Sequence, residues 1–457
     1  MPRGGSVPAH APGADDFVRL GEYPFVVASW IDERGFPISV ATAFETDADA
    51  GVIHVAPPAG IDIPPDREVS LIGSHIRPKP GEGYDQRRYL QLWGTAVASH
   101  SGRLTITPSR AWGWDEAEVP FFEYSERSVP QSRRYLAQLS AEQGRVVKPR
   151  LAFGWLMLRT TRLPFLTATA VPVLLGIAIA ARHGAFDWWL ALVTLIGAAL
   201  AHLAINVTND VFDTLSGADA ANATPTQFSG GSRVAIYDLL SVRQLALLAA
   251  GLYAGAGLIG LYLVAVTGSV LVLWIGLTGI GLGIAYTAPP LKLVYRGVGE
   301  VAVALGFGPV MLLGAYAVQT GRLSLEAVVA SVPVAILVAL ILYVNEIPDR
   351  PGDAAAGKRT LPVRLAPEVV QTIYLVAALA AFAVIIGGVV SGVLPWPTLV
   401  AVAALPVALR VHRGIQTHYT SPYTLMAVMG TNITLHLAVG ALLLAAYVAV
   451  TLVSLLT

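Results

Sequence analysis

The stretch Asn206-Val-Thr-Asn209-Asp210-Val-Phe-Asp213 follows directly on the apolar run Trp188–Ile205. In a helix, Asn206, Asp210 and Asp213 fall at positions i, i+4 and i+7 and therefore share one face. Carboxylates this close to a run of hydrocarbon-soluble residues are energetically costly and are usually functional. The stretch predicts a helical membrane protein with a polar site at one edge of the bilayer.

A second stretch, Asn345-Glu-Ile-Pro-Asp349-Arg-Pro-Gly-Asp353, stands in the same position after another apolar run. Its Asn and two Asp residues lie at i, i+4 and i+8, again on one helical face. Pro348 and Pro351 predict that this helix is interrupted. Oxygen ligands suit Mg²⁺, which often shares its coordination with substrate phosphates. Helix capping beside a hydrated loop would explain one such stretch, whereas two together predict a site for metal ions and a highly anionic ligand.

The composition supports a membrane protein. The 457 residues are 54% hydrophobic and 13% charged, and the mean hydropathy of +0.61 is higher than that of ordinary soluble proteins. A formal net charge of zero argues against electrostatic binding of nucleic acid. The absence of cysteine excludes disulfides, cysteine-ligated metals and a thiol nucleophile.

The polar N-terminal part and the apolar remainder predict separate domains. Short β-like segments punctuated by turn signals, such as Asp32-Glu-Arg-Gly35, indicate a small barrel or sandwich. We predict a disordered tail over residues 1–16, a soluble β-barrel domain over 17–145, a linker over 146–162 and a transmembrane domain over 163–457.

The apolar part contains about nine candidate spans of the length that a bilayer requires. They are Leu163–Ala181, Trp188–Ile205, Leu245–Thr267, Val270–Tyr286, Val301–Val318, Ala327–Val344, Val369–Val390, Leu394–Ala408 and Thr431–Leu455. The eighth is short, so we expect it to be tilted or broken.

Lysine and arginine in the connecting loops predict the orientation in the membrane. One side of the predicted bundle collects Arg159, Arg162, Arg233, Arg243, Lys292, Arg296, Arg350, Lys358, Arg359, Arg364, Arg410 and Arg413. The opposite side offers Arg182 and Arg322. The basic side carries both acidic stretches, so we expect the site and the N-terminal domain on the cytoplasmic side of the cell membrane and the C-terminus outside.

Four basic residues near the acidic stretches are candidates for neutralising an anion. Arg233 follows the glycine-rich segment Ser229-Gly-Gly-Ser232, Lys358 and Arg359 follow the second stretch, and Lys292 lies between the fourth and fifth spans. A loop of this composition can present backbone N–H groups to phosphate, which lysine and arginine then neutralise. For any single one of the four, the bias of basic residues toward the cytoplasm is a sufficient explanation.

The two acidic stretches resemble the two aspartate-rich motifs of the UbiA superfamily of intramembrane aromatic prenyltransferases. With TPTQFSGGSR and AYTAPPLKLVYRGVGE between them, the similarity extends over about residues 155–457. The four segments look like the branch that contains 1,4-dihydroxy-2-naphthoate polyprenyltransferases of menaquinone synthesis. Glu346 and Pro348 stand where that branch more usually has Asn and Arg.

This resemblance implies an all-α bundle of about nine transmembrane helices with a lateral opening to lipid. The residues implied to hold a pair of Mg²⁺ ions are Asn206, Asp210, Asp213, Asn345, Asp349 and Asp353, with Asp210 and Asp349 as catalytic residues. The ions would bridge an isoprenoid diphosphate, and Arg233, Lys292, Lys358 and Arg359 would help to neutralise it.

The implied reaction transfers a polyprenyl group to an aromatic acceptor, and for a naphthoate it replaces the carboxyl group as CO₂. Tyr286 and Tyr343 are candidates for facing the allylic cation, with interfacial anchoring as the alternative. Another phenolic acceptor or a lipid acceptor remains open within the superfamily, and a membrane transporter is the alternative from a different class.

The N-terminal domain is similar to the flavin-binding split barrel of the pyridoxamine-phosphate-oxidase type. The similarity rests on the strand order and on the segments REVSLIGSHIRP and YLQLWGTA. It implies a flavin cofactor, and an interaction or regulatory module is the alternative. His75, Arg77, Lys79, Arg87 and Arg88 supply positive charge nearby, for which solvated loop charge is the alternative interpretation.

Overall fold

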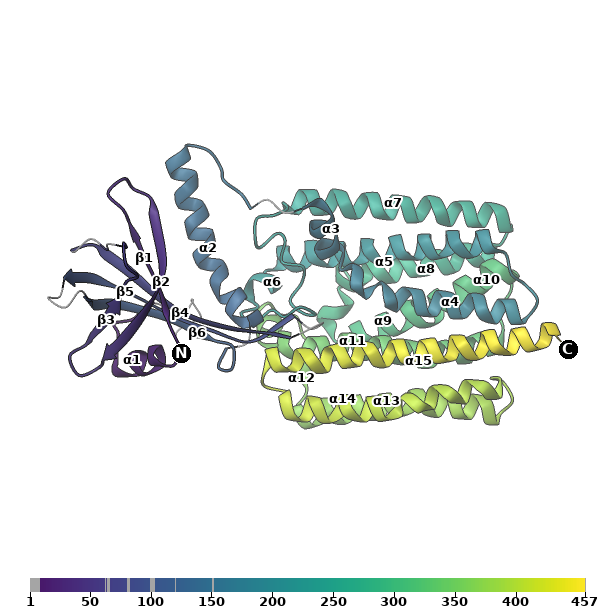
Figure 1. Ribbon diagram of the computed structural model, residues 1–457. Coiled ribbons are helices and arrows are strands. Elements are labelled where there is room, and N and C mark those ends of the chain that lie inside the picture. Colours follow the sequence, from purple (N-terminus) through teal and green to yellow (C-terminus); the bar gives the residue numbers. More distant parts are fainter. Residues whose placement is uncertain are drawn as a thin grey trace. The chain divides into compact units, whose positions relative to one another are not determined.

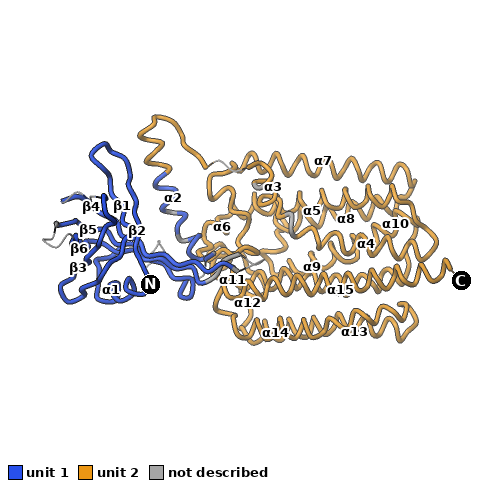
Figure 2. Tube along the Cα trace, viewed as in Figure 1, with its two compact units in different colours: residues 1–135 blue, residues 136–457 orange. Residues whose placement is uncertain are grey.

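A computed structural model of the chain describes residues 9–61, 63, 66–79, 83–98, 103–119, 121–149 and 152–456. The chain separates into two compact units, residues 1–135 and residues 136–457, which Figure 2 distinguishes by colour. Helix α2 (Phe121–Gln143) contains the boundary between them.

The first unit is a closed antiparallel barrel with the strand order β1-β2-β3-β6-β5-β4. The strands are β1 (Val26–Ile31), β2 (Pro37–Asp47), β3 (Val52–Ala56), β4 (Glu68–Lys79), β5 (Gly83–Ala98) and β6 (Leu104–Asp115). Val26, Ala28 and Trp30 alternate into the barrel core, as expected for strands with one buried face. The predicted β-barrel is confirmed.

Two local features support the pairing of neighbouring strands in this barrel. The β1–β2 turn is held by Asp32, whose side chain accepts hydrogen bonds from the backbone N–H groups of Arg34 and Phe36. Gly94 lies where the β5–β6 register shifts, and a Cβ atom there would be 2.3 Å from the Thr107 carbonyl oxygen. Glycine therefore permits a backbone approach that a side chain would block.

Residues 9–16 lie against the barrel, although the sequence predicted a tail over residues 1–16. His10 pairs with Ala111 through backbone hydrogen bonds. Helix α1 (Ala14–Gly21) begins with Asp16 accepting a hydrogen bond from the Gly13 N–H, and it buries Phe17 in the barrel core. Polar capping and one apolar helix face order this segment. Residues 1–8 lie outside the described residues.

The second unit is a bundle of long helices that lie side by side in Figure 1. Its helices are α3 (Phe153–Thr161), α4 (Thr167–Arg182), α5 (Trp188–Ser216), α6 (Ala218–Ala221), α7 (Val242–Thr267), α8 (Val270–Thr287), α9 (Gly299–Leu305), α10 (Met311–Thr320), α11 (Leu325–Ala355), α12 (Leu361–Arg364), α13 (Pro367–Val390), α14 (Leu405–His418) and α15 (Pro422–Leu456). Short 3-10 or π segments are η1 (Leu163–Leu166), η2 (Leu293–Arg296), η3 (Gly306–Val310) and η4 (Trp396–Ala404).

The described residues contain 8 helical segments long and apolar enough to cross a membrane. The first predicted span corresponds to α4, a shorter apolar helix of 16 residues. The predicted eighth span is longer than expected, because η4 and α14 together form a 23-residue helical segment over Trp396–His418. Its helix type changes at Leu405, immediately before a proline that lacks a backbone donor. The predicted helical membrane class is confirmed.

Helix α11 is the most enclosed of the candidate spans. The prediction that its prolines interrupt it is wrong, because the helix continues through Pro348 and Pro351 to Ala355. A proline at 351 removes the N–H that would bind the Ile347 carbonyl. Arg350 replaces this donor, since its Nε lies 2.9 Å from the Ile347 oxygen. The second acidic stretch therefore stays on one regular helix.

Candidate functional site

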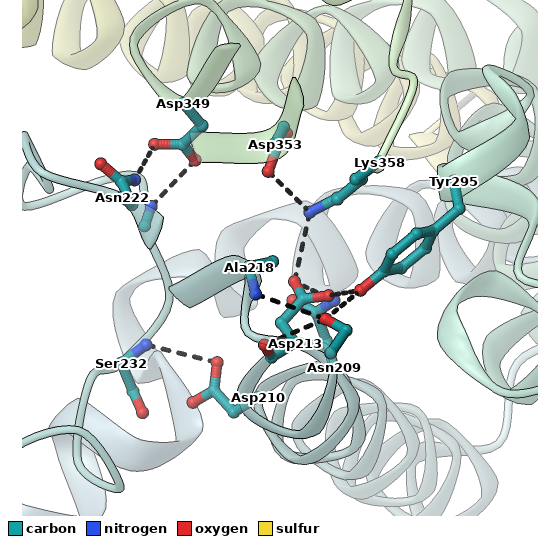
Figure 3. A network of polar contacts seen from close by, with 12 residues as sticks. Asn209, Asp210, Asp213, Ala218, Asn222, Ser232, Tyr295, Asp349, Asp353 and Lys358 are labelled. Atoms are coloured by element: carbon teal, nitrogen blue, oxygen red, sulfur yellow. Dashed lines mark hydrogen bonds and ion pairs between the residues drawn. The ribbon is translucent and has the colours of Figure 1, made fainter. Parts of the chain in front are cut away.

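The two acidic stretches meet across one lysine at the ends of α5 and α11 (Figure 3). Lys358 Nζ lies 3.2 Å from Asp213 Oδ2 and 3.6 Å from Asp353 Oδ1. The chain reverses at Gly357, where φ is +73°, and the Lys358 N–H donates to the Asp353 carbonyl oxygen. This turn returns the ammonium group to the end of α11. The structure thus brings together three of the residues that the sequence singled out.

Lys358 is largely buried, with 12% of its side chain exposed. Burial lowers the pKa of this lysine, but the neighbouring carboxylates of Asp213 and Asp353 outweigh it and raise the pKa well above the ordinary value. The ammonium is therefore charged at neutral pH and offsets the repulsion between two buried acids.

Asp213 accepts hydrogen bonds from two further groups. Tyr295 donates its hydroxyl to Asp213 Oδ1 at 2.8 Å, and Asn209 Nδ2 donates to Asp213 Oδ2 at 3.1 Å. Asn209 lies one helical turn earlier on α5, so this contact follows from the i, i+4 spacing. Asp213 is consequently fixed in orientation.

Asp210 is paired with an arginine that the sequence analysis used only in the loop-charge count. Arg162, which caps α3 with a φ of +53°, places Nη2 2.5 Å from Asp210 Oδ1. The Ser232 N–H lies 3.3 Å from the same oxygen. Asp210 Oδ2 is buried without a hydrogen-bond partner among the described residues. Asn206 donates to the Thr161 carbonyl oxygen at 3.1 Å, which ties α5 to the end of α3.

Asp349 is bound to the loop between α6 and α7. Its Oδ1 accepts from Asn222 Nδ2 at 2.7 Å and its Oδ2 accepts from the Gly230 N–H at 2.9 Å. Gly352 allows this close approach, because a Cβ atom there would lie 2.8 Å from the Asn222 Cα. In this arrangement Asp349 holds the loop with both carboxylate oxygens.

The same loop encloses a further acid, Asp219, which sequence reasoning missed. Its side chain lines the cavity described below and is only 4% exposed. Burial, reinforced by the charges of Asp210 and Asp213, raises the pKa of Asp219 to about 8. Gly231 has a φ of +74°, and a Cβ atom there would be 2.6 Å from Asp219 Oδ1. The signal was the position of Asp219 in the polar segment that continues the first stretch.

Of the four predicted anion-binding residues, Lys358 alone belongs to the described residues that line the cavity presented below. Arg233 instead donates to the backbone oxygens of Asp219 and Asn222 and so supports the loop. Lys292 lies over the ring of Tyr295, with its Nζ 5.1 Å from the centroid. Arg359 is exposed.

The site contains oxygen atoms that suit a divalent cation. Asp210 Oδ2, Asp353 Oδ2 and Asn345 Oδ1 are buried without hydrogen-bond partners in the described part of the chain, and both carboxylate oxygens of Glu346 share this property. Buried acceptors normally have a partner, and a cation supplies one. Among the described residues no group of three acidic or histidine side chains is close enough to bind one ion together.

A cavity of about 490 Å³ extends from this polar site into the bundle. Its polar end is lined by Arg162, Asn206, Asn209, Asp213, Asp219, Asn345, Glu346, Asp349, Asp353 and Lys358. The remaining lining is mostly apolar and reaches Thr194, Val264 and Val318 near the opposite ends of α5, α7 and α10. Along α5, Asp213 and Thr194 are separated by about 29 Å. Such a cavity suits a molecule with an anionic head and a long apolar tail.

The two tyrosines suggested for the cation differ in position. Tyr286 lines the cavity. Tyr343 is buried outside that lining, and its hydroxyl donates to the Val370 carbonyl oxygen at 3.1 Å. Tyr286 is therefore the one whose ring can contact a molecule in the cavity.

The basic residues suggested for the barrel are partly engaged in ion pairs. Arg87 pairs with Glu116 and lies over the Phe121 ring, while Arg88 pairs with Glu22 at 2.8 Å. His75 is exposed. Arg77 lies on β4, and the side chain of Lys79 lies outside the described residues. The flavin expected for this domain stays a prediction.

Comparison with known proteins identifies the family and the relatives that this chain resembles. Residues 169–422 match the model of the UbiA prenyltransferase family. The chain is 30% identical over 299 residues to the 2-carboxy-1,4-naphthoquinone phytyltransferase of Synechocystis sp., covering 64% of this chain and 92% of that protein. It is 29% identical over 262 residues to the 1,4-dihydroxy-2-naphthoate octaprenyltransferase of Bacillus subtilis, covering 57% and 82%.

Among solved structures, a UbiA homologue from Archaeoglobus fulgidus bound to GPP and Mg²⁺ aligns with a TM-score of 0.49 at 14% identity. The alignment covers 65% of this chain and 99% of that one.

Replacing Lys358 with glutamine should lower the thermal unfolding temperature of the purified protein. The change leaves Asp213 and Asp353 buried without their shared cation, and loss of one partner of a buried ion pair costs about 3–5 kcal/mol. The adjacent Arg359→Gln is the control, because an exposed side chain away from such features changes stability by only about 0.5 kcal/mol. Equal shifts in the two variants would show that Lys358 does not join the two acids.

Proposed function

The chain belongs to the UbiA prenyltransferase family, and on that premise we propose that it transfers a polyprenyl group from an isoprenoid diphosphate to 1,4-dihydroxy-2-naphthoate, a step of menaquinone biosynthesis. The observation that carries this proposal is the continuous cavity, polar and charged at one end and apolar over the rest. Its polar end matches a diphosphate, and its apolar length matches a prenyl tail.

The acceptor is inferred from the relatives. Proteins about 30% identical to this chain are named for transfer to naphthoate compounds. Glu346 and Pro348 are the departures from the motif usual in that branch, and Glu346 lines the cavity. Another phenolic acceptor or a lipid acceptor is therefore the second candidate. Membership of an enzyme family decides against the transporter alternative.

The proposed Mg²⁺ ligands are Asn206, Asp210, Asp213, Asn345, Asp349 and Asp353. The partnerless oxygens of Asp210, Asn345 and Asp353 support this set, because Mg²⁺ prefers oxygen ligands. When bound, Mg²⁺ would neutralise charge that develops on the diphosphate as the allylic C–O bond breaks. Asp210 and Asp349 are the proposed catalytic residues, and in the structure both also hold the surrounding loop and helix end.

The basic residues of the polar end would act on the same leaving group. Lys358 and Arg162 both line the cavity, so each can donate charge-assisted hydrogen bonds to diphosphate oxygens. Fixed donors aimed at developing charge stabilise the transition state without reorganising. Arg233, Lys292 and Arg359, outside the lining, would contribute through the loops that they support or through the positive potential of this face.

The apolar lining would protect the other product of ionisation. Breaking the C–O bond leaves an allylic cation, which the water-poor wall shields from hydrolysis. The ring of Tyr286 lines the cavity and can stabilise the cation through its π face. A ring carbon of the naphthoate then bonds to the allylic carbon, and the carboxyl group on that ring carbon leaves as CO₂.

An assay of the purified full-length protein with octaprenyl diphosphate and a panel of acceptors tests this function. We expect a prenylated, decarboxylated product from 1,4-dihydroxy-2-naphthoate only when Mg²⁺ is present, and a loss of about 100-fold or more in kcat for Asp213→Asn and Asp353→Asn. Asp187→Asn is the matched control, because this acid caps the opposite end of α5 and asparagine caps equally well. Product from a different acceptor alone would support the second candidate, and full activity of both site variants would refute the metal role.

The apolar part of the cavity predicts a preference for long prenyl chains. Gly260 lines the cavity, and a Cβ atom there would meet open space. Gly260→Phe should lower kcat/KM for octaprenyl diphosphate by about tenfold, which corresponds to about 1.4 kcal/mol, while geranyl diphosphate reacts nearly as before. Gly251→Phe is the control on the same helix, since Gly251 is exposed and lies outside the lining. Equal losses with both substrates would contradict a tail site here.

The proposed orientation places the acidic site and the N-terminal domain in the cytoplasm. Because the chain has no cysteine, single cysteines can report it without background. Glu368 and Ser391 are exposed at opposite ends of α13. In intact cells a membrane-impermeant maleimide should label Ser391→Cys and leave Glu368→Cys unlabelled until the cells are opened. The reverse pattern would contradict the loop-charge argument.

A further inference from the structure

A histidine lies in the cavity wall just below the polar site. His202 is on α5, is only 4% exposed, and lines the cavity. It precedes Asn206 by one helical turn and therefore stands about 6 Å deeper in the bundle. Its ring packs against Phe307 in a T-shaped arrangement, with the two ring centroids 4.7 Å apart. Burying a polar ring in an otherwise apolar part of the wall costs free energy unless its nitrogens form hydrogen bonds.

One ring nitrogen of His202 is already engaged. Nδ1 lies 2.7 Å from the hydroxyl oxygen of Thr169, which is 1% exposed. Within the described ranges the Thr169 hydroxyl forms no other hydrogen bond. A buried hydroxyl uses its proton where an acceptor is available, so Thr169 donates to Nδ1. The neutral imidazole then carries its proton on Nε2.

The second nitrogen, Nε2, is the one left to bind a molecule in the cavity that His202 lines. Nε2 has no hydrogen-bond partner among the described residues. It is nevertheless not one of the polar atoms that are both without a partner and fully buried. His436 differs in this respect, because both of its ring nitrogens are sealed and it lies outside the cavity lining. His202 thus presents an N–H donor to a molecule in the cavity, whereas His436 is a core histidine.

We propose that the Nε2–H of His202 donates a hydrogen bond to the ring hydroxyl oxygen of the aromatic acceptor and so positions the acceptor. This inference rests on the proposed function. It makes His202 a residue that determines specificity for hydroxylated aromatic acceptors.

The depth of His202 matches the place of the acceptor. Under the proposed function the diphosphate would lie at the level of Asp210 and Asp213, and its allylic carbon would extend from there into the cavity. His202 lies about 12 Å from Asp210 along α5, which leaves room for that carbon and for an aromatic ring beside it. In a hydroxyl group ortho to a carboxylate, the proton bonds to the carboxylate. The hydroxyl oxygen therefore keeps a lone pair that can accept from Nε2–H.

Two naphthoates that differ by one hydroxyl group provide the test. Isothermal titration of the detergent-solubilised full-length protein with 1-hydroxy-2-naphthoate and 2-naphthoate measures both affinities. We expect His202→Ala to weaken binding of the hydroxylated compound about tenfold and to leave binding of 2-naphthoate within about twofold. His202→Gln, which retains an N–H donor, should recover most of the loss. His436→Ala should change neither affinity, since this histidine lies outside the cavity lining.

Two results would overturn the proposal. Equal affinity of wild type and His202→Ala for 1-hydroxy-2-naphthoate would show that Nε2 makes no contact with the hydroxyl group. An equal loss for both compounds, without recovery in His202→Gln, would show a purely structural role.

Kinetics separate this inference from the proposed function. With prenyl diphosphate and 1,4-dihydroxy-2-naphthoate, His202→Ala should raise KM for the acceptor about tenfold and leave KM for the diphosphate unchanged. A wild-type protein that forms no prenylated product from 1,4-dihydroxy-2-naphthoate would refute the proposed acceptor, while the titrations still decide whether His202 recognises a ring hydroxyl. A wild-type protein that forms product with an unchanged acceptor KM in His202→Ala would refute the role of His202 alone.

Discussion

The ion pairs of Lys358 with Asp213 and Asp353 are the constraint on which the polar end of the bundle depends. Two buried carboxylates on different helices repel each other, and each one has lost most of its hydration. A single ammonium group between them offsets both costs and joins the end of α5 to the end of α11. Because Lys358 lies just beyond α11, the tight turn at Gly357 is part of the same arrangement.

The loop between α6 and α7 completes the polar end from the other side. Asp349 accepts from Asn222 and from the Gly230 N–H, and Arg233 binds two backbone oxygens of the loop. Gly231 allows the backbone to approach Asp219, and Gly352 allows α11 to approach Asn222, at distances that a side chain would prevent. The loop therefore places hydrogen-bond donors beside acids that retain oxygens without hydrogen-bond partners. The donors suit an anion, and the acid oxygens suit a cation.

Much of the fold followed from elementary patterns. Apolar runs of bilayer length predicted the helices, and short alternating segments with turn signals predicted the barrel. The predictions were wrong where a side chain compensates for a local feature in a way that the sequence pattern does not show. Proline content predicted a break in α11, but the Arg350 side chain supplies the missing donor. Residues 9–16 read as a polar tail, but a cap at Asp16 and the apolar side chain of Phe17 order the segment.

The sequence by itself determined the membrane class and the placement of Asn206, Asp210 and Asp213 on one helical face, because hydropathy and the 3.6-residue period are properties of short segments. Only the tertiary structure decided which basic residue joins the acidic stretches. Lys358 and Asp213 are 145 positions apart in the chain, and four cations were equally plausible from charge alone. It also decided that Arg162 and Asp219 belong to the site and that His202 lines the cavity. Such contacts depend on loop paths and helix packing, which the spacing of residues along one segment does not encode.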